Sequence, residues 1–139
     1  MDSLVHRLLS VVERTPDKIF AHLISVSGES SLSYAELLAE SARYAAFYQE
    51  HGLRKGDVLL LMLRPGAASY QAFVGAMLAG MVPAFMPLPG PKQPPEVYWP
   101  IHRDVVARKD VKAVLPHADH AVEIEKYMPT SGLAVLHVE

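Results

Sequence analysis

Apolar residues recur at helical spacing at the start of the chain, and further along they gather into short unbroken runs. The apolar positions of residues 4–12 predict an amphipathic helix that ends at Thr15, just before a proline. Residues 18–26 are rich in β-branched and aromatic side chains, which favours a strand. A serine-glycine turn follows, and residues 30–33 fit a short returning strand. The chain is therefore expected to open with a helix and an antiparallel hairpin.

The best-signalled helix boundary in the sequence lies at Ser33. Ser33 and Glu36 have the spacing of a capping box, in which each side chain accepts a hydrogen bond from the other residue's amide. Leu32 and Leu37 occupy the two positions of a hydrophobic staple. The predicted helix ends at Gly52, a residue suited to the left-handed conformation of a helix terminus. Its buried stripe is expected to contain Leu37, Ser41, Tyr44, Ala45 and Tyr48.

Beyond this helix, apolar runs alternate with helical patterns. The runs predict strands over residues 57–63, 81–86, 111–115 and 133–138. Helices are predicted between them, over residues 96–108 and 121–128 and over a stripe made of Tyr70, Phe73, Val74, Met77 and Leu78. Pro100 fits the helix over 96–108 only if it lies in the first turn.

Strands that are apolar throughout are buried on both faces, which is typical of a parallel sheet between helices. The predicted fold is therefore α/β, with a mostly parallel sheet flanked by helices and a short N-terminal antiparallel hairpin. We expect residues 1–139 to form a single domain. The chain stops directly after a predicted strand, which favours truncation of a larger domain.

Composition narrows the functional classes. Half of the residues are apolar, and 13 basic against 15 acidic side chains give a net charge of −2 without a basic cluster. A nucleic-acid-binding face is therefore not expected. There is no cysteine, and neither a signal peptide nor an apolar run long enough to span a bilayer is present. We expect a soluble, cytoplasmic protein.

Local sequence motifs indicate no catalytic or nucleotide-binding site. The dinucleotide fingerprint, the P-loop and the nucleophile elbow are all missing from the sequence. The turn over residues 63–67 joins a strand to a helix start whose amides could bind an anion, but a plain connecting turn is the favoured interpretation. His117 and His120 flank Asp119, yet zinc needs three or four ligands, so capping-region histidines are favoured. His22 is interpreted as a core or edge histidine of its strand.

Two aromatic residues stand beside a proline-rich loop over residues 87–95. Tyr98 and Trp99 could form a surface for a small molecule or a partner, although packing of a helix start is the favoured interpretation. If they are exposed, they would add to an apolar surface at the final strand, over residues 133–138. Such a surface predicts self-association.

Three segments in order resemble the first part of the adenylate-forming superfamily, which includes acyl-CoA synthetases, fatty acyl-AMP ligases and peptide-synthetase adenylation domains. Residues 32–37 read LSYAEL, like that family's T-Y-x-E-L helix start. Residues 52–58 read GLRKGDV, like G-[VL]-x-x-G-D-x-V, and residues 72–83 read AFVGAMLAGMVP, like A-x-L-G-x-x-x-A-G-x-x-x-x-P. The resemblance covers residues 15–115, and the loop over 87–99 is closer to the acyl-CoA synthetase and fatty acyl-AMP ligase branch.

The resemblance implies an N-terminal fragment of an AMP-binding ligase domain. The parent enzyme would use ATP and Mg to activate a carboxylic acid, in particular a fatty acid, as acyl-AMP for transfer to CoA or a carrier protein. The matching segments build the fold, so no catalytic, cofactor-binding or metal residue is assigned to this chain. Thr130-Ser131-Gly132 echoes the family's phosphate loop but lacks the rest of it, and this interpretation is rejected. The fragment alone is expected to be inactive, with the rest of the ligase as its partner.

Two other functions are alternatives to the ligase fragment. One is a stand-alone, non-catalytic binding or self-association module of the same fold. The other is a flavodoxin-like or receiver-like regulatory domain, which needs acidic residues at strand carboxyl ends. Asp57 lies at the start of its predicted strand, which counts against a receiver.

Overall fold

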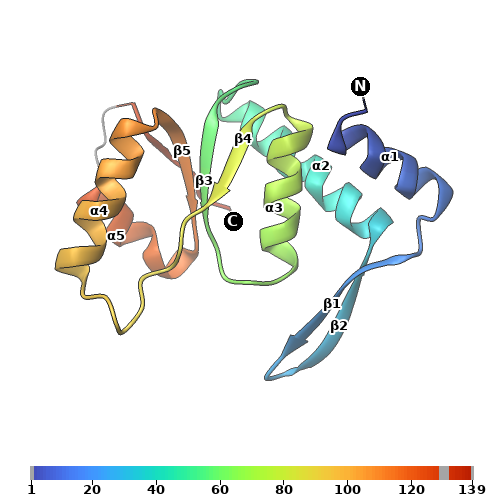
Figure 1. Ribbon diagram of the computed structural model, residues 1–139, viewed down its shortest axis with the longest axis horizontal. Coiled ribbons are helices and arrows are strands. Elements are labelled where there is room, and N and C mark those ends of the chain that lie inside the picture. Colours follow the sequence, from blue (N-terminus) through green and yellow to red (C-terminus); the bar gives the residue numbers. More distant parts are fainter. Residues whose placement is uncertain (1, 129–131, 139) are drawn as a thin grey trace.

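A computed structural model describes residues 2–128 and 132–138. Figure 1 shows helices packed around a small central sheet, with a separate hairpin projecting from one end. In chain order the elements are α1 (Leu4–Arg14), β1 (Ile19–Ser25), β2 (Gly28–Ser33), α2 (Tyr34–Glu50), β3 (Val58–Met62), α3 (Ala67–Leu78), β4 (Val82–Phe85), α4 (Pro95–Arg108), β5 (Val111–Pro116), the 3-10 turn η1 (Ala118–His120), α5 (Ala121–Tyr127) and β6 (Ala134–Val135).

The central sheet has the order β4-β3-β5-β6, and every neighbouring pair is parallel. β1 and β2 form a separate antiparallel hairpin. These pairings confirm the predicted α/β fold with its parallel sheet and N-terminal hairpin. None of the helices within residues 2–128 and 132–138 is long and apolar enough to cross a membrane.

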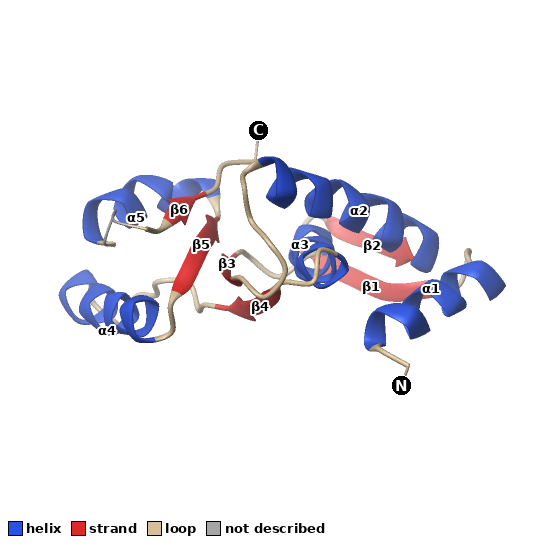
Figure 2. Cartoon of the chain, turned by 90° about the horizontal axis from the view of Figure 1, so that it is seen from above, coloured by secondary structure: helices blue, strands red, loops and turns tan. Residues whose placement is uncertain are grey.

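The side chains of β3 show why its sequence is apolar throughout. Leu59 and Leu61 pack on the face of the sheet covered by α2 and α3. Leu60 and Met62 pack on the opposite face, with residues of α4 and α5. Because both faces are covered, Leu59 to Met62 are buried and Val58 is partly buried, as expected for a parallel sheet between helices. Figure 2 shows the helices lying on either side of the strands.

The predicted helix start at Ser33 is confirmed. The Ser33 amide donates to Glu36 Oε2 at 2.8 Å, and the Glu36 amide donates to Ser33 Oγ at 3.2 Å. Leu32 and Leu37 are both buried, as the hydrophobic staple requires. Gly52 follows the helix end with a φ of +80°, in the region that favours glycine.

The buried face of α3 differs from the prediction. The large apolar side chains of this helix are only partly buried, and Tyr70 is exposed. The buried positions are small residues instead: Ser69, Ala72, Gly75 and Ala76. A Cβ at Gly75 would lie 2.6 Å from Tyr44 Cβ, so the two helices cross too closely for a larger residue. Small residues therefore occupy the face of α3 that crosses α2, and the larger side chains of this helix are only partly buried.

One expectation about α4 was wrong, and another is confirmed. Pro100 lies beyond the first turn, because the helix begins at Pro95. The proline nitrogen cannot donate to the Glu96 carbonyl, but both residues are exposed, so water can satisfy that group. The favoured packing of Tyr98 and Trp99 is confirmed, since their exposed fractions are 0% and 1%, and the alternative of an exposed aromatic surface is wrong. They pack into the core against Tyr127, whose ring stacks on Trp99.

The last strand is shorter than predicted. Residues 133–138 were expected to be β, whereas β6 contains only Ala134 and Val135. Its ladder with β5 continues for one more hydrogen bond, from the Leu136 amide to the Val114 carbonyl at 2.9 Å. Thr130 and Ser131 of the rejected phosphate-loop echo lie outside the described residues.

Candidate functional site

The carboxyl ends of β3 and β5 form the place where this sheet is best suited to bind a ligand. β3 and β5 are neighbours and parallel, so both strands end at the same edge of the sheet. After β3 the chain passes through α3 to β4 on one side, and after β5 it passes through α5 to β6 on the other. This reversal is the topological switch point at which open α/β sheets bind ligands.

Polar side chains from the two connections meet at this edge. Arg64 follows β3, and Asp119 lies in η1 after β5, 55 residues further along the chain. Arg64 Nη2 donates to Asp119 Oδ2 at 2.7 Å. Both side chains are more than half exposed, so the pair positions the two loops but adds little to folding stability.

His117 stabilises the turn that carries Asp119. The Asp119 amide donates to His117 Nδ1 at 3.3 Å, and the His117 amide donates to the Met62 carbonyl at 2.7 Å. Because Nδ1 accepts the amide proton, it carries no proton of its own in this arrangement. The 3.3 Å between Nδ1 and Asp119 Oδ2 is therefore proximity and not an ion pair. His117 has the capping role that the sequence favoured.

A pocket of about 240 Å³ opens beside this polar pair. It is lined by Tyr44, Leu63, Leu115, Pro116, His117, Ala118, Ala121, His137 and Val138. Pockets that enclose a whole small molecule usually measure about 300–1,000 Å³. The pocket can therefore hold part of a small molecule, and residues outside this pocket would have to enclose the rest.

His137 contributes the second imidazole of this pocket. Its Nε2 lies 3.3 Å from Glu125 Oε1 on α5, which fixes the ring beside the end of β6. The two histidines of the pocket come from different loops, and neither forms a hydrogen bond with a serine side chain among the described residues. The arrangement offers polar contacts for a ligand, without an activated nucleophile in the part of the chain that the structure describes.

The strand-to-helix turn over residues 63–67 forms hydrogen bonds with the first turn of α3. The Gly66 amide donates to Ser69 Oγ at 3.2 Å, and that hydroxyl donates back to the Gly66 carbonyl at 2.7 Å. The serine hydroxyl thus takes one of the amides that an anion would need. The favoured interpretation of a plain connecting turn agrees with this geometry.

The remaining candidate residues make local contacts within the fold. His120 Nδ1 lies 3.5 Å from Glu123 Oε2 within its own turn of helix. Within residues 2–128 and 132–138, no group of three or more histidine and carboxylate side chains could hold a metal ion.

His22 is exposed on β1, opposite Ser31 of β2, at an edge and not in the core. The Tyr98 hydroxyl donates to the Pro87 carbonyl, and burial, with Glu123 as a second cause, raises the pKa of Tyr98 to about 12.

Sequence reasoning missed the pairing of Arg64 with Asp119 and the contribution of His137. The available signal was positional, because Arg64 and His117 are among the first polar residues after two predicted parallel strands. His137 carried no such signal, since it was placed inside the predicted last strand.

Comparison with solved structures gives a consistent set of relatives. The chain is similar to a fatty acyl-adenylate ligase from Legionella pneumophila, solved with acyl adenylate and pyrophosphate, at 27% identity and a TM-score of 0.78 over 96% of this chain. It is also similar to a benzoate CoA ligase from Burkholderia xenovorans, at 19% identity and a TM-score of 0.75 over all of this chain. The N-terminal subdomain of NpsA from Klebsiella oxytoca matches 99% of the chain at 17% identity, with a TM-score of 0.71. The last two likenesses show the fold alone.

The chain spans only part of these relatives, covering 23%, 26% and 31% of their respective lengths. Comparison with curated proteins returned no match. A family model described as AMP-binding enzyme matches residues 8–96, which is more than half of the sequence. This chain therefore belongs to the AMP-binding enzyme family.

Proposed function

We propose that this chain is the N-terminal part of an adenylate-forming ligase. The parent protein would join a carboxylic acid to AMP with release of pyrophosphate, and then pass the acyl group to CoA or to a carrier protein. The observation that carries the proposal is the match of almost the whole chain to about a quarter of a fatty acyl-adenylate ligase, at 27% identity. That relative's name favours a fatty acid as the substrate class. The reaction consumes ATP, which favours the cytoplasm as its compartment.

The residues of this chain do not fit ATP or Mg by themselves. In the turn before α3, Ser69 Oγ accepts from the Gly66 amide, so a phosphate would have to displace that bond. Carboxylates near the sheet edge are also engaged, because Asp119 pairs with Arg64. We therefore propose that the groups that hold ATP and Mg belong to the remainder of the ligase, and we assign no catalytic residue here.

The proposed role of this chain is to supply one wall of the parent's ligand site. The pocket at the carboxyl ends of β3 and β5 is smaller than most ligand pockets, so the remainder of the ligase would supply its other walls. The hydrogen bond between Arg64 and Asp119 links the two loops at the rim of this pocket. The remainder of the ligase is therefore this chain's first partner, and CoA or a carrier protein would be reached through the parent.

The isolated chain tests the non-catalytic part of this proposal. We expect no carboxylate-dependent exchange of labelled pyrophosphate into ATP at ordinary enzyme concentrations. A Gly75→Leu variant, which disrupts the α2–α3 crossing, is the control for contaminating ligases, because a contaminant's signal would persist in it. Exchange by the unmodified chain that vanishes in the variant would overturn the proposal.

A stand-alone binding or self-association module is the second candidate. It is favoured by large apolar side chains exposed on α4, namely Val97, Ile101 and Val105. The coding frame beyond residue 139 separates the two candidates. A frame that continues into a ligase supports the first, and a stop codon supports the second.

A further inference from the structure

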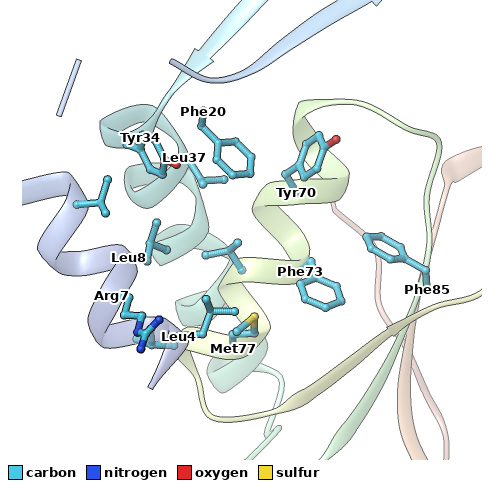
Figure 3. A pocket seen from close by; sticks show the side chains of 13 residues that line it. Leu4, Arg7, Leu8, Phe20, Tyr34, Leu37, Tyr70, Phe73, Met77 and Phe85 are labelled. Carbon is cyan, nitrogen blue, oxygen red and sulfur yellow. The ribbon is translucent and has the colours of Figure 1, made fainter. Parts of the chain in front are cut away.

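An apolar hollow lies away from the sheet edge, between α1, the hairpin and α3. Its volume is about 480 Å³, within the usual range of about 300–1,000 Å³ for small-molecule pockets. It shares no lining residue with the pocket at the ends of β3 and β5. Figure 3 shows its walls, which are formed by Leu4, Val5, Arg7, Leu8, Val11, Phe20, Tyr34, Leu37, Tyr70, Phe73, Val74, Met77 and Phe85.

Aromatic rings form the side of the cavity opposite α1. Phe20 meets Tyr70 edge-on, with ring centroids 5.4 Å apart, and Phe73 stacks on Phe85 at 5.1 Å. Tyr70 and Phe85 are each about half exposed, so this apolar wall faces water. Tyr70 and Phe73 belong to α3, whose buried positions are small residues at the crossing with α2. An apolar surface of this kind usually marks a binding site.

Arg7 is the single charged residue of the lining. It is exposed and lies on α1, at the edge of the cavity, and Figure 3 shows Phe85 on the opposite side in this view. Like Arg14, Arg54 and Arg103, Arg7 has no ion pair with a carboxylate among the described residues, so its guanidinium is available to a ligand. A guanidinium beside hydrocarbon is a site for a carboxylate, which it can bind with two parallel hydrogen bonds.

We propose that this cavity binds a monocarboxylic acid with an apolar body. The carboxylate lies against Arg7 at the mouth, and the hydrocarbon lies between α1 and the aromatic wall around Phe73. Apolar burial supplies affinity, and the guanidinium selects the anionic head. The site is separate from the ligand site proposed at the sheet edge and does not depend on it.

The wall formed by α1 should respond to the ligand. No residue of α1 is fully buried, although its apolar side chains line the cavity. A helix held by so little packing opens readily in local fluctuations. A ligand that fills the cavity adds the missing contacts and stabilises the closed helix. Amides of α1 should therefore gain protection from hydrogen exchange when the acid binds, while amides of α5, on the far side of the sheet, should not.

Titration calorimetry with three probes of equal chain length tests the head-group selection. The probes are decanoate, 1-decanol and decyltrimethylammonium, at pH 7, where the acid is ionised, and at concentrations below micelle formation. We expect decanoate to bind one per chain, about tenfold or more tightly than decanol, with the cation weakest. Equal affinities for decanoate and decanol, or no saturable binding, would overturn the proposal.

Two variants and a matched control test the location. Arg7→Gln should weaken decanoate binding about tenfold and leave decanol binding unchanged. Val74→Phe should fill the cavity and weaken both ligands, and Met77→Phe serves if that variant does not fold. Arg14→Gln is the control, because Arg14 lies on the same helix outside this lining. The proposal fails if Arg7→Gln and Arg14→Gln have the same effect.

A second copy of the chain is the competing occupant. Sedimentation of the unmodified chain with and without decanoate separates the two cases. We expect the sedimentation coefficient to be unchanged by decanoate. A dimer that Val74→Phe dissociates, together with no decanoate binding to the resulting monomer, would assign the cavity to an interface and overturn the proposal.

Discussion

The hydroxyl of Tyr48 in α2 donates a hydrogen bond of 2.9 Å to the main-chain carbonyl of Ala72 in α3, at a position closed to solvent. Burial raises the pKa of Tyr48 well above its ordinary value, so the hydroxyl keeps its proton and remains a donor. We predict that Tyr48→Phe lowers the free energy of unfolding by about 1 kcal/mol. Urea denaturation measures the loss, and Tyr44→Phe should cost less, because the Tyr44 hydroxyl on the same helix has no hydrogen-bond partner among the described residues. Equal losses would contradict this role for the Tyr48 hydroxyl.

The same helix crossing depends on the absence of a side chain at Gly75. A Cβ there would lie 2.7 Å from the Ser41 carbonyl oxygen as well as against Tyr44. In an exposed helix, glycine to alanine usually stabilises by about 0.5–1 kcal/mol. Here we predict the opposite sign, a loss on the order of 1–3 kcal/mol for Gly75→Ala in urea denaturation. Gly90→Ala, with no atom within 4 Å of the added carbon, is the control and should change stability little.

The capping box predicts a pH dependence of stability. The hydrogen bond from the Ser33 amide, followed by that from its hydroxyl, lowers the pKa of Glu36 below the ordinary value of 4.5. A carboxyl whose pKa is lower in the folded state contributes stability above its unfolded pKa, and this is lost as the pH falls through the folded value. We predict that acidification below pH 4.5 destabilises the native chain more than it destabilises Glu36→Gln. Parallel curves of unfolding free energy against pH for both proteins would argue against the box.

Self-association is predicted at the open edge of the sheet. Among residues 2–128 and 132–138, β6 pairs with β5 alone, so its other side is a strand edge there. Val135 is partly buried against the core cluster of α4 and α5, so a charge there would disturb the fold. Val138 is exposed, and Val138→Lys should reduce association at micromolar concentrations without loss of helix content. Light scattering and circular dichroism measure the two effects, and a monomer in both proteins would contradict the prediction.

The strands were predictable because their signal is continuous along the sequence. β3 and β5 are apolar at almost every position, and the contacts that bury both faces explain this pattern. The buried face of α3 was not predictable from hydrophobicity. Its core positions are small, because Gly75 must approach α2 closely, whereas its large residues line a cavity. Periodicity finds apolar residues but does not distinguish a core from a pocket.

The candidate site was predictable only in outline. Parallel strands place their carboxyl ends together, so the vicinity of Arg64 and His117 follows from the strand assignment. The ion pair between Arg64 and Asp119 joins residues 55 positions apart, and no local pattern encodes it. The positions of Tyr98 and Trp99 were also open, since an aromatic pair at a helix start suits a core or a surface equally.

We propose that this chain forms one wall of an adenylate-forming ligase and that the catalytic groups belong to the remainder of that enzyme. A chimaera tests this proposal, with this chain replacing the matching quarter of the Legionella pneumophila fatty acyl-adenylate ligase. The measurement is fatty-acid-dependent exchange of pyrophosphate into ATP, with a Gly75→Leu chimaera as the control for the fold of the inserted wall. We predict exchange in the chimaera and none in that ligase when the quarter is deleted. A chimaera that folds by circular dichroism and yet shows no exchange would contradict the claim.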